Sequence, residues 1–76
     1  MKNKLVRQVE MINVTDGHNK VWLASLYDNG DVTCEWGRIG NGLQSKTFKK
    51  VGSDYLEKKM NEKLKKNYAI DSDDSF

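Results

Sequence analysis

Trp36 and Arg38 place a large aromatic ring and a guanidinium two residues apart in the chain. In an extended strand, residues two apart point to the same side of the sheet, so we expect these two side chains to share a face. A flat indole can stack on a base or a sugar, and the arginine fork matches phosphate oxygens. The pair therefore indicates a contact with nucleic acid.

A phosphate site also needs close backbone N–H groups and further cations. Glycines around the pair allow close approach, although a glycine-rich connector also serves as a plain turn. Nearby lysines are candidate phosphate contacts, and each is equally explained as a solubilising surface residue. No pattern suggests base-edge recognition, so we predict little sequence specificity. The predicted nucleic-acid-binding residues are Trp36, Gly37, Arg38, Gly40, Lys46, Lys49 and Lys50.

The charges along the chain are unevenly distributed. Residues 36–66 carry nine basic and three acidic side chains, whereas residues 1–35 carry four basic and five acidic ones. The segment from Asp71 onward adds three aspartates and no base. A concentrated basic region is typical of a protein that binds polyanions, and a solvated lysine-rich helix explains it equally well.

Length and composition exclude several function classes. Seventy-six residues suffice for one small domain and leave no room for a catalytic cleft between two lobes. No apolar run approaches the about 20 residues that cross a bilayer. The single cysteine, Cys34, excludes an internal disulfide and favours a reducing, cytoplasmic location. With one histidine, His18, in a turn, we predict no metal, no cofactor and no enzymatic activity.

The expected strands are residues 5–14, 20–28, 32–38 and 43–49, separated by turn residues. Asn29-Gly30 predicts a two-residue hairpin turn. That register pairs Leu23 with Trp36 and sets Trp36 and Trp22 on opposite faces. One helix covers only one face, so Trp36 is expected on the open face. A small protein that spreads its aromatic residues over both faces of a thin sheet explains this pattern as well.

After residue 50 the apolar period changes from that of a strand to that of a helix. Ser53 or Asp54 can cap the start, and Leu56, Met60 and Leu64 form an apolar stripe. Asn67 can end the helix in a left-handed conformation. Residues 68–70 are a possible edge strand. The predicted fold is α+β: an antiparallel sheet of four to five strands with one helix packed on one face.

Trp36-Gly37-Arg38-Ile39-Gly40 resembles the signature of the WGR domain family. The similarity extends to Asn19-Lys20-Val21-Trp22, to Gly42-Leu43-Gln44 with Lys46-Thr47-Phe48, and to the close Glu62–Tyr68, so it covers about residues 5–70. It implies a WGR domain at 5–70; outside it we expect a flexible N-terminus at 1–4 and, from its composition, a frayed acidic tail at 71–76. Asn67 stands where bacterial members usually carry glycine, and the acidic tail replaces a longer segment of the eukaryotic members.

The resemblance implies a binding module. The family binds DNA breaks in some poly(ADP-ribose) polymerases, where the signature tryptophan packs on the sugar at a 5′ end and the arginine supports contacts between domains. By resemblance, Trp36 stacks on a terminal nucleotide and Arg38 orients that surface or contacts phosphate or a partner. The leading hypothesis is therefore a module for DNA ends or nicks. The alternatives are a protein-interaction adaptor that uses this face or a sheet edge, and a scaffold with no independent role; RNA is not distinguished from DNA.

Overall fold

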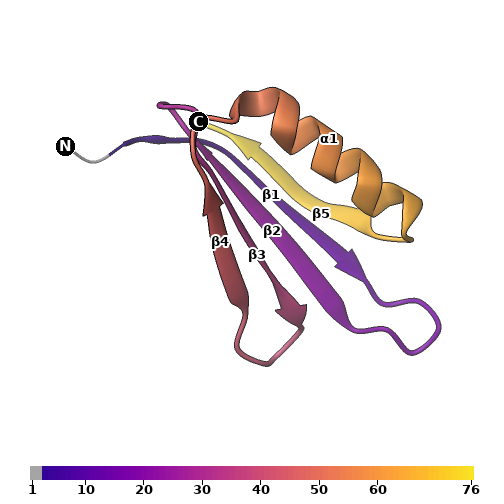
Figure 1. Cartoon of the computed structure of the whole chain (residues 1–76). Coiled ribbons are helices and arrows are strands. Elements are labelled where there is room, and N and C mark those ends of the chain that lie inside the picture. Colours follow the sequence, from indigo (N-terminus) through magenta and orange to yellow (C-terminus); the bar gives the residue numbers. More distant parts are fainter. Residues whose placement is uncertain (1–2) are drawn as a thin grey trace.

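The computed structural model describes residues 3–76. Within them the chain forms five strands and one helix, which confirms the predicted α+β class (Figure 1). The expected flexible segment 1–4 lies partly outside the described residues. The elements are β1 (Leu5–Asn13), β2 (Lys20–Tyr27), β3 (Val32–Arg38), β4 (Gln44–Phe48), α1 (Gly52–Lys65) and β5 (Ala69–Ser75).

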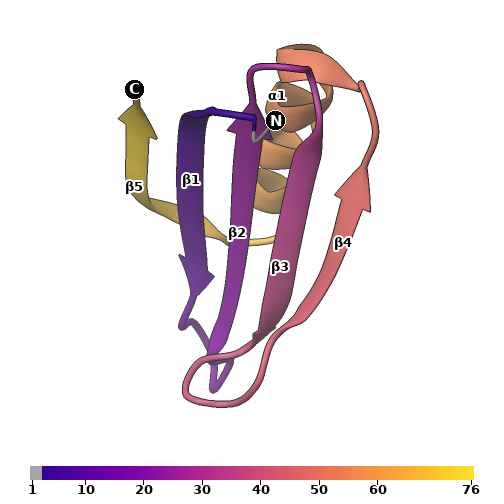
Figure 2. The same cartoon turned by 90° about the vertical axis from the view of Figure 1, so that its left-hand side faces the viewer.

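The strands form one antiparallel sheet in the order β4-β3-β2-β1-β5. The first four strands form a meander, and α1 carries the chain across one face so that β5 pairs with β1 at the opposite edge. With the sheet toward the viewer, the helix lies behind β2 and β3 and the other face is open (Figure 2). The residues between sheet and helix form the core: Val9, Met11, Trp22, Ala24, Leu26, Val32, Cys34, Leu56 and Met60.

The β2–β3 hairpin differs from the prediction by one residue. The Tyr27 N–H donates to the Asp31 carbonyl (2.9 Å) and the Gly30 N–H donates to the Tyr27 carbonyl (3.0 Å), so three residues form the loop. Gly30 has φ 90°, the left-handed value of a bulged three-residue turn. Trp22 consequently pairs with Trp36. Since a slip of one residue moves a strand's side chains to the other face, the predicted separation of the two tryptophans is wrong.

The helix begins two to three residues earlier than predicted, because its N-cap position is Val51 and not Ser53 or Asp54. No side chain caps it: Val51 occupies the N-cap position without a side-chain hydrogen bond, and Asp54 lies in the first turn near the positive end of the helix dipole. Leu56 and Met60 are buried, but Leu64 is 46% exposed and does not complete the predicted stripe. The predicted end is confirmed, because Asn67 has φ 69°.

The acidic segment 71–75 is part of an ordered strand, where we expected a frayed tail. β5 pairs with β1 along its length, with a register irregularity opposite Glu10 and Met11. Arg7 of β1 fastens it, because its guanidinium donates to both carboxylate oxygens of Asp73 (3.0 and 2.7 Å). The same guanidinium contacts Glu57 of α1 and so joins sheet, helix and edge strand. The acidic charges therefore lie at the sheet edge farthest from β4.

Candidate nucleic-acid interface

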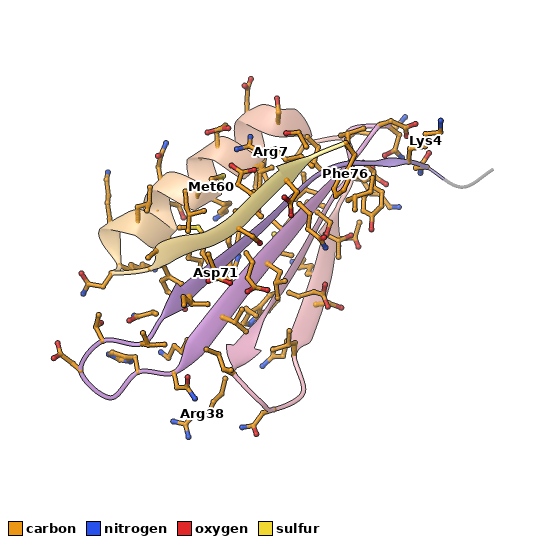
Figure 3. The ribbon with its side chains drawn as sticks, turned by 180° about the vertical axis from the view of Figure 1, so that it is seen from behind. Lys4, Arg7, Arg38, Met60, Asp71 and Phe76 are labelled. Carbon is orange, nitrogen blue, oxygen red and sulfur yellow. The ribbon has the colours of Figure 1, made fainter. Side chains whose placement is uncertain are left out.

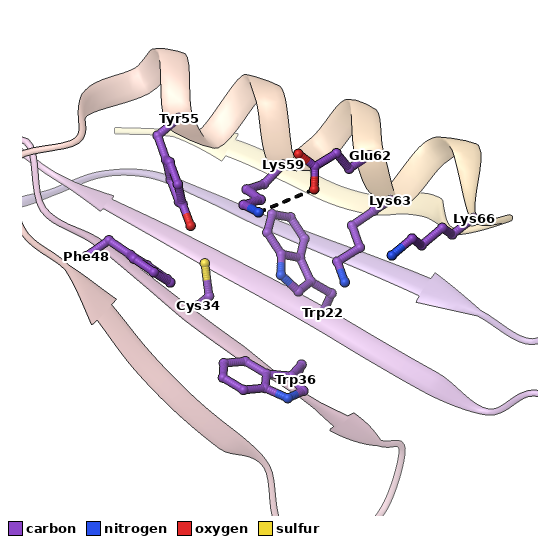
Figure 4. A pocket seen from close by; sticks show the side chains of 9 residues that line it. All are labelled: Trp22, Cys34, Trp36, Phe48, Tyr55, Lys59, Glu62, Lys63 and Lys66. Atoms are coloured by element: carbon purple, nitrogen blue, oxygen red, sulfur yellow. Dashed lines mark hydrogen bonds and ion pairs between the residues drawn. The ribbon is translucent and has the colours of Figure 1, made fainter.

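Trp36 lies on the helix face of the sheet, just beyond the part that the helix covers. Its neighbour Trp22 is only 3% exposed, whereas Trp36 is half-buried at the border of the core. The expectation that Trp36 lies on the open face is therefore wrong. The indole remains accessible, because Trp36 lines two hollows beside α1 (Figure 4).

Two hollows meet at Trp36. One, of about 260 Å³, lies toward β4 and the start of the helix. The other, of about 280 Å³, lies toward the end of β3 and the end of the helix. Both are lined by Trp36 and Lys63, so they form one surface, which we name the Trp36 groove. It is lined by Lys20, Trp22, Cys34, Trp36, Gly37, Arg38, Phe48, Tyr55, Lys59, Glu62, Lys63, Lys66 and Tyr68.

Cations dominate the rim of this groove. Five basic side chains line it, against one carboxylate among the described residues, that of Glu62. That carboxylate is partly neutralised because Lys59 Nζ lies 3.3 Å from Glu62 Oε1. Lys59 and Lys63 of α1 and Lys66, the C-cap residue that follows it, are spaced i, i+4 and i+7 and line the same groove. The groove thus combines aromatic walls with a row of positive charge.

Lys63 is the central cation. Its Nζ lies 5.3 Å from the centre of the Tyr68 ring and 6.0 Å from that of Trp22, within the range of cation–π attraction. Burial lowers the pKa of Lys63 below its usual value, and the charges of Lys66 and Lys59 lower it further. An anion in the groove would offset both effects, so this crowding of cations favours a phosphate ligand.

Arg38 lies at the end of β3, exposed and at the far end of the molecule from Lys4 and Phe76 (Figure 3). It lines the groove with Trp36 and Gly37, so the structure brings these three predicted residues together. A Cβ added to Gly37 would lie 3.1 Å from Leu43 Cδ2, so a side chain there would require Leu43 to shift by a few tenths of an ångström. Gly40 instead faces a hollow on the open side of the sheet.

The three predicted lysines occupy different positions. Lys46 lies opposite Cys34 on the helix face, and its Nζ is 5.2 Å from the centre of the Phe48 ring, beside the groove. Lys49 and Lys50 follow β4 and lie against the β2–β3 turn. There Lys49 Nζ is 3.2 Å from Asp31 Oδ2, and the Lys50 backbone N–H donates to Asp31 Oδ1. The structure does not bring these two lysines into the groove.

Four basic groove residues were missed from the sequence, namely Lys20, Lys59, Lys63 and Lys66, as were Tyr55 and Tyr68. The spacing of the three helix lysines was a usable signal, since it places them on one side of a helix. The sequence does not show which side of the helix faces Trp36, because that depends on how α1 packs on the sheet.

The described residues offer little that is reactive. Burial raises the pKa of the Cys34 thiol, which disfavours the thiolate. His18 lies exposed in the β1–β2 loop. Residues 3–76 contain no group of three or more His, Cys, Asp or Glu placed to hold a metal ion. No helix of this part of the chain is long and apolar enough to span a membrane.

A comparison with protein families finds a match to the model described as WGR domain over residues 6–75. The matched segment includes the tripeptide at 36–38, the helix and the acidic strand β5. Neither the curated proteins nor the solved structures yield a match to this chain.

Proposed function

The chain belongs to the WGR domain family, and from this premise we propose that it is a non-enzymatic module that binds DNA at ends or nicks. The WGR domain is a binding module associated with nucleic acid, and the match spans nearly the whole chain. The observation that carries the proposal is the Trp36 groove, where an accessible indole is bordered by five basic side chains.

The groove suits the end of a strand. In the proposed mode, the Trp36 ring packs on the terminal sugar or base, and Arg38 and Lys20 receive the phosphate at the open end of the groove. Lys63 and Lys66 contact the next phosphate from the helix. A continuous duplex would cover the rim but leave the indole unused, which is the physical basis for a preference for ends. The groove lining is mostly aromatic rings and ammonium groups, so little sequence preference is expected.

The direct test is a binding titration with three DNAs at two salt concentrations. A duplex with 5′-phosphorylated ends, the same duplex without the phosphate and a closed circle of the same sequence separate end binding from general attraction to polyanions. We expect the phosphorylated ends to bind most tightly and the circle most weakly. Equal weak affinity for all three would contradict the proposal. A matched RNA duplex shows whether the ligand class is DNA alone.

The lysines of the groove should control the salt dependence. Removing one lysine–phosphate interaction lowers the slope of log K against log salt by about 0.7–0.9. We expect Lys63→Gln to lower the slope by about this amount, because Lys63 lies at the centre of the groove. Lys49→Gln is the matched comparison, because Lys49 lies against Asp31 outside the groove. A larger change for Lys49 than for Lys63 would move the binding surface to the β2–β3 turn.

A second candidate function is protein docking on the open face of the sheet. A hollow of about 390 Å³ lies there between Ile12, Leu23 and the β3–β4 loop, and Ile39 and Leu43 are 39% and 38% exposed. Exposed apolar side chains around a hollow are typical of interaction sites. This candidate predicts a complex without nucleic acid, either with itself or with a partner protein, that Leu43→Asp abolishes. Light scattering and pull-down check it, and a monomer without partners would contradict it.

A further inference from the structure

The hollow between Trp36 and Phe48 has a lining that the binding of a strand end does not require. In the proposed mode, the terminal nucleotide uses the side of Trp36 that faces Arg38. The opposite side of the ring faces the other hollow of the Trp36 groove, the one of about 260 Å³ that is lined by Phe48 and Tyr55. Figure 4 shows Tyr55 descending from α1 and Phe48 reaching from β4 toward Cys34, with Trp36 on the other side of the space.

The walls of this hollow are aromatic. The Phe48 and Tyr55 rings form one wall, with centroids 4.9 Å apart and planes tilted by 39°. Trp36 and the edge of Trp22 form the other, and Cys34, 4% exposed, forms the floor. Aromatic walls favour a flat ring over a branched aliphatic group, because stacking uses the whole ring face.

The rim adds positive charge to this aromatic space. Lys59, Lys63 and Lys66 border it from the helix, and Lys46 lies beside it. The ligand that fits therefore carries a negative charge next to a flat ring, as a nucleotide does. The volume of about 260 Å³ is below the about 300–1,000 Å³ of sites for drug-sized molecules, so we consider a ligand no larger than one base.

We propose that this hollow is a subsite for one unpaired base, next to the terminal nucleotide held by Trp36 and Arg38. The base lies between Trp36 and the Phe48–Tyr55 wall, and its phosphate meets Lys63. Stacking uses the ring face that all bases share, so every base is accepted with similar affinity. The inference rests on the proposed function and adds a ligand preference: frayed or overhanging ends over blunt ones.

The test compares three duplex ends by fluorescence titration. One carries a single unpaired nucleotide, the second carries an abasic residue at the same place, and the third is blunt. The first two have the same number of phosphates, so their ratio reports the base alone. We expect the unpaired base to strengthen binding about 5- to 100-fold over the abasic end, on the 5′ or the 3′ strand.

Two variants locate the effect. Tyr55→Ala removes half of one wall and should bring the ratio of base to abasic affinity close to one. Tyr55→Phe keeps the ring and should retain the wild-type ratio. If Tyr55→Ala does not fold by circular dichroism, Tyr55→Leu serves instead, because it keeps an apolar side chain against the core and still removes the ring.

Each outcome decides one of the two ideas. Equal affinity for base and abasic ends, together with a preference for ends over circles, overturns the subsite and leaves the proposed function standing. A ratio that survives the loss of the Tyr55 ring, in whichever of Tyr55→Ala and Tyr55→Leu is folded, places the base elsewhere and also overturns the subsite. No binding to any of the three ends overturns the subsite and the proposed function together.

Discussion

Trp36→Ala should weaken binding to phosphorylated DNA ends about 5- to 150-fold at constant salt, the equivalent of about 1–3 kcal/mol for one stacked residue. The reason is geometric: Trp36 borders both hollows of the groove, so its loss removes the surface that the lysines surround. Because the indole carries no charge, the salt slope should stay close to that of the wild type. A fluorescence anisotropy titration over a range of salt measures both quantities.

Controls must separate binding from folding, because Trp36 also packs against the core. Urea unfolding of the variant gives its stability, and the titration is run where it is fully folded. Trp36→Phe keeps a flat ring and should retain part of the affinity. Ile39→Ala, three residues away on an exposed loop, is the matched neutral change for end binding. Unchanged affinity in a folded Trp36→Ala protein would remove the aromatic contact from the mechanism.

Arg7→Ala should lower the free energy of unfolding by about 1–3 kcal/mol at pH 7, because Arg7 makes charge-assisted hydrogen bonds that join β5 to the body of the domain. The side chains of Arg7 and Asp73 are 22% and 31% exposed, so solvent screens this pair only in part. The contact with Glu57, which is 53% exposed, contributes less. For a domain of this size, such a loss is a large share of the total stability.

The effect of Arg7→Ala should depend on pH in a defined direction. The hydrogen bonds from Arg7 lower the pKa of Asp73. The stability that this pair provides is therefore complete above the ordinary aspartate pKa of about 3.9 and is lost as the pH falls through the lower folded value. The pKa of Glu10 is raised by a hydrogen bond with Asp71 and by burial, but this shift is present in both proteins and cancels in their difference.

Urea unfolding of the wild type and Arg7→Ala from pH 7 to pH 2 checks this prediction. The difference in unfolding free energy should stay constant from pH 7 to about pH 5 and shrink below about pH 4. Lys58→Ala, at an exposed position of α1, is the control for loss of one positive charge. A difference that grows toward low pH would mean that the ion pair with Asp73 does not stabilise β5.

The acidic strand shows where local composition misleads. Three aspartates within six residues have low strand propensity, so the sequence favours a frayed end. The strand forms because the backbone groups at the edge of β1 pair with it and because the Arg7 guanidinium donates two hydrogen bonds to the Asp73 carboxylate. Arg7 and Asp73 are 66 residues apart in the chain, and a window of local sequence does not relate them.

The sequence alone determined the family, the fold class, the segments of β1 to β4 and of α1 to within a few residues, and the grouping of Trp36 with Arg38. These depend on alternation, turn residues and spacing, which are local properties. The tertiary structure alone decided which face holds Trp36 and which cations surround it. One extra loop residue at Asp28–Gly30 shifts the register of the hairpin, so that Trp22 and Trp36 lie on the same face of the sheet. The packing of α1 brings Lys59, Lys63 and Lys66 close to the indole. Both depend on contacts between segments that are distant in the chain. Local patterns allow more than one strand register and helix orientation, and the energy of these long-range contacts selects one of them.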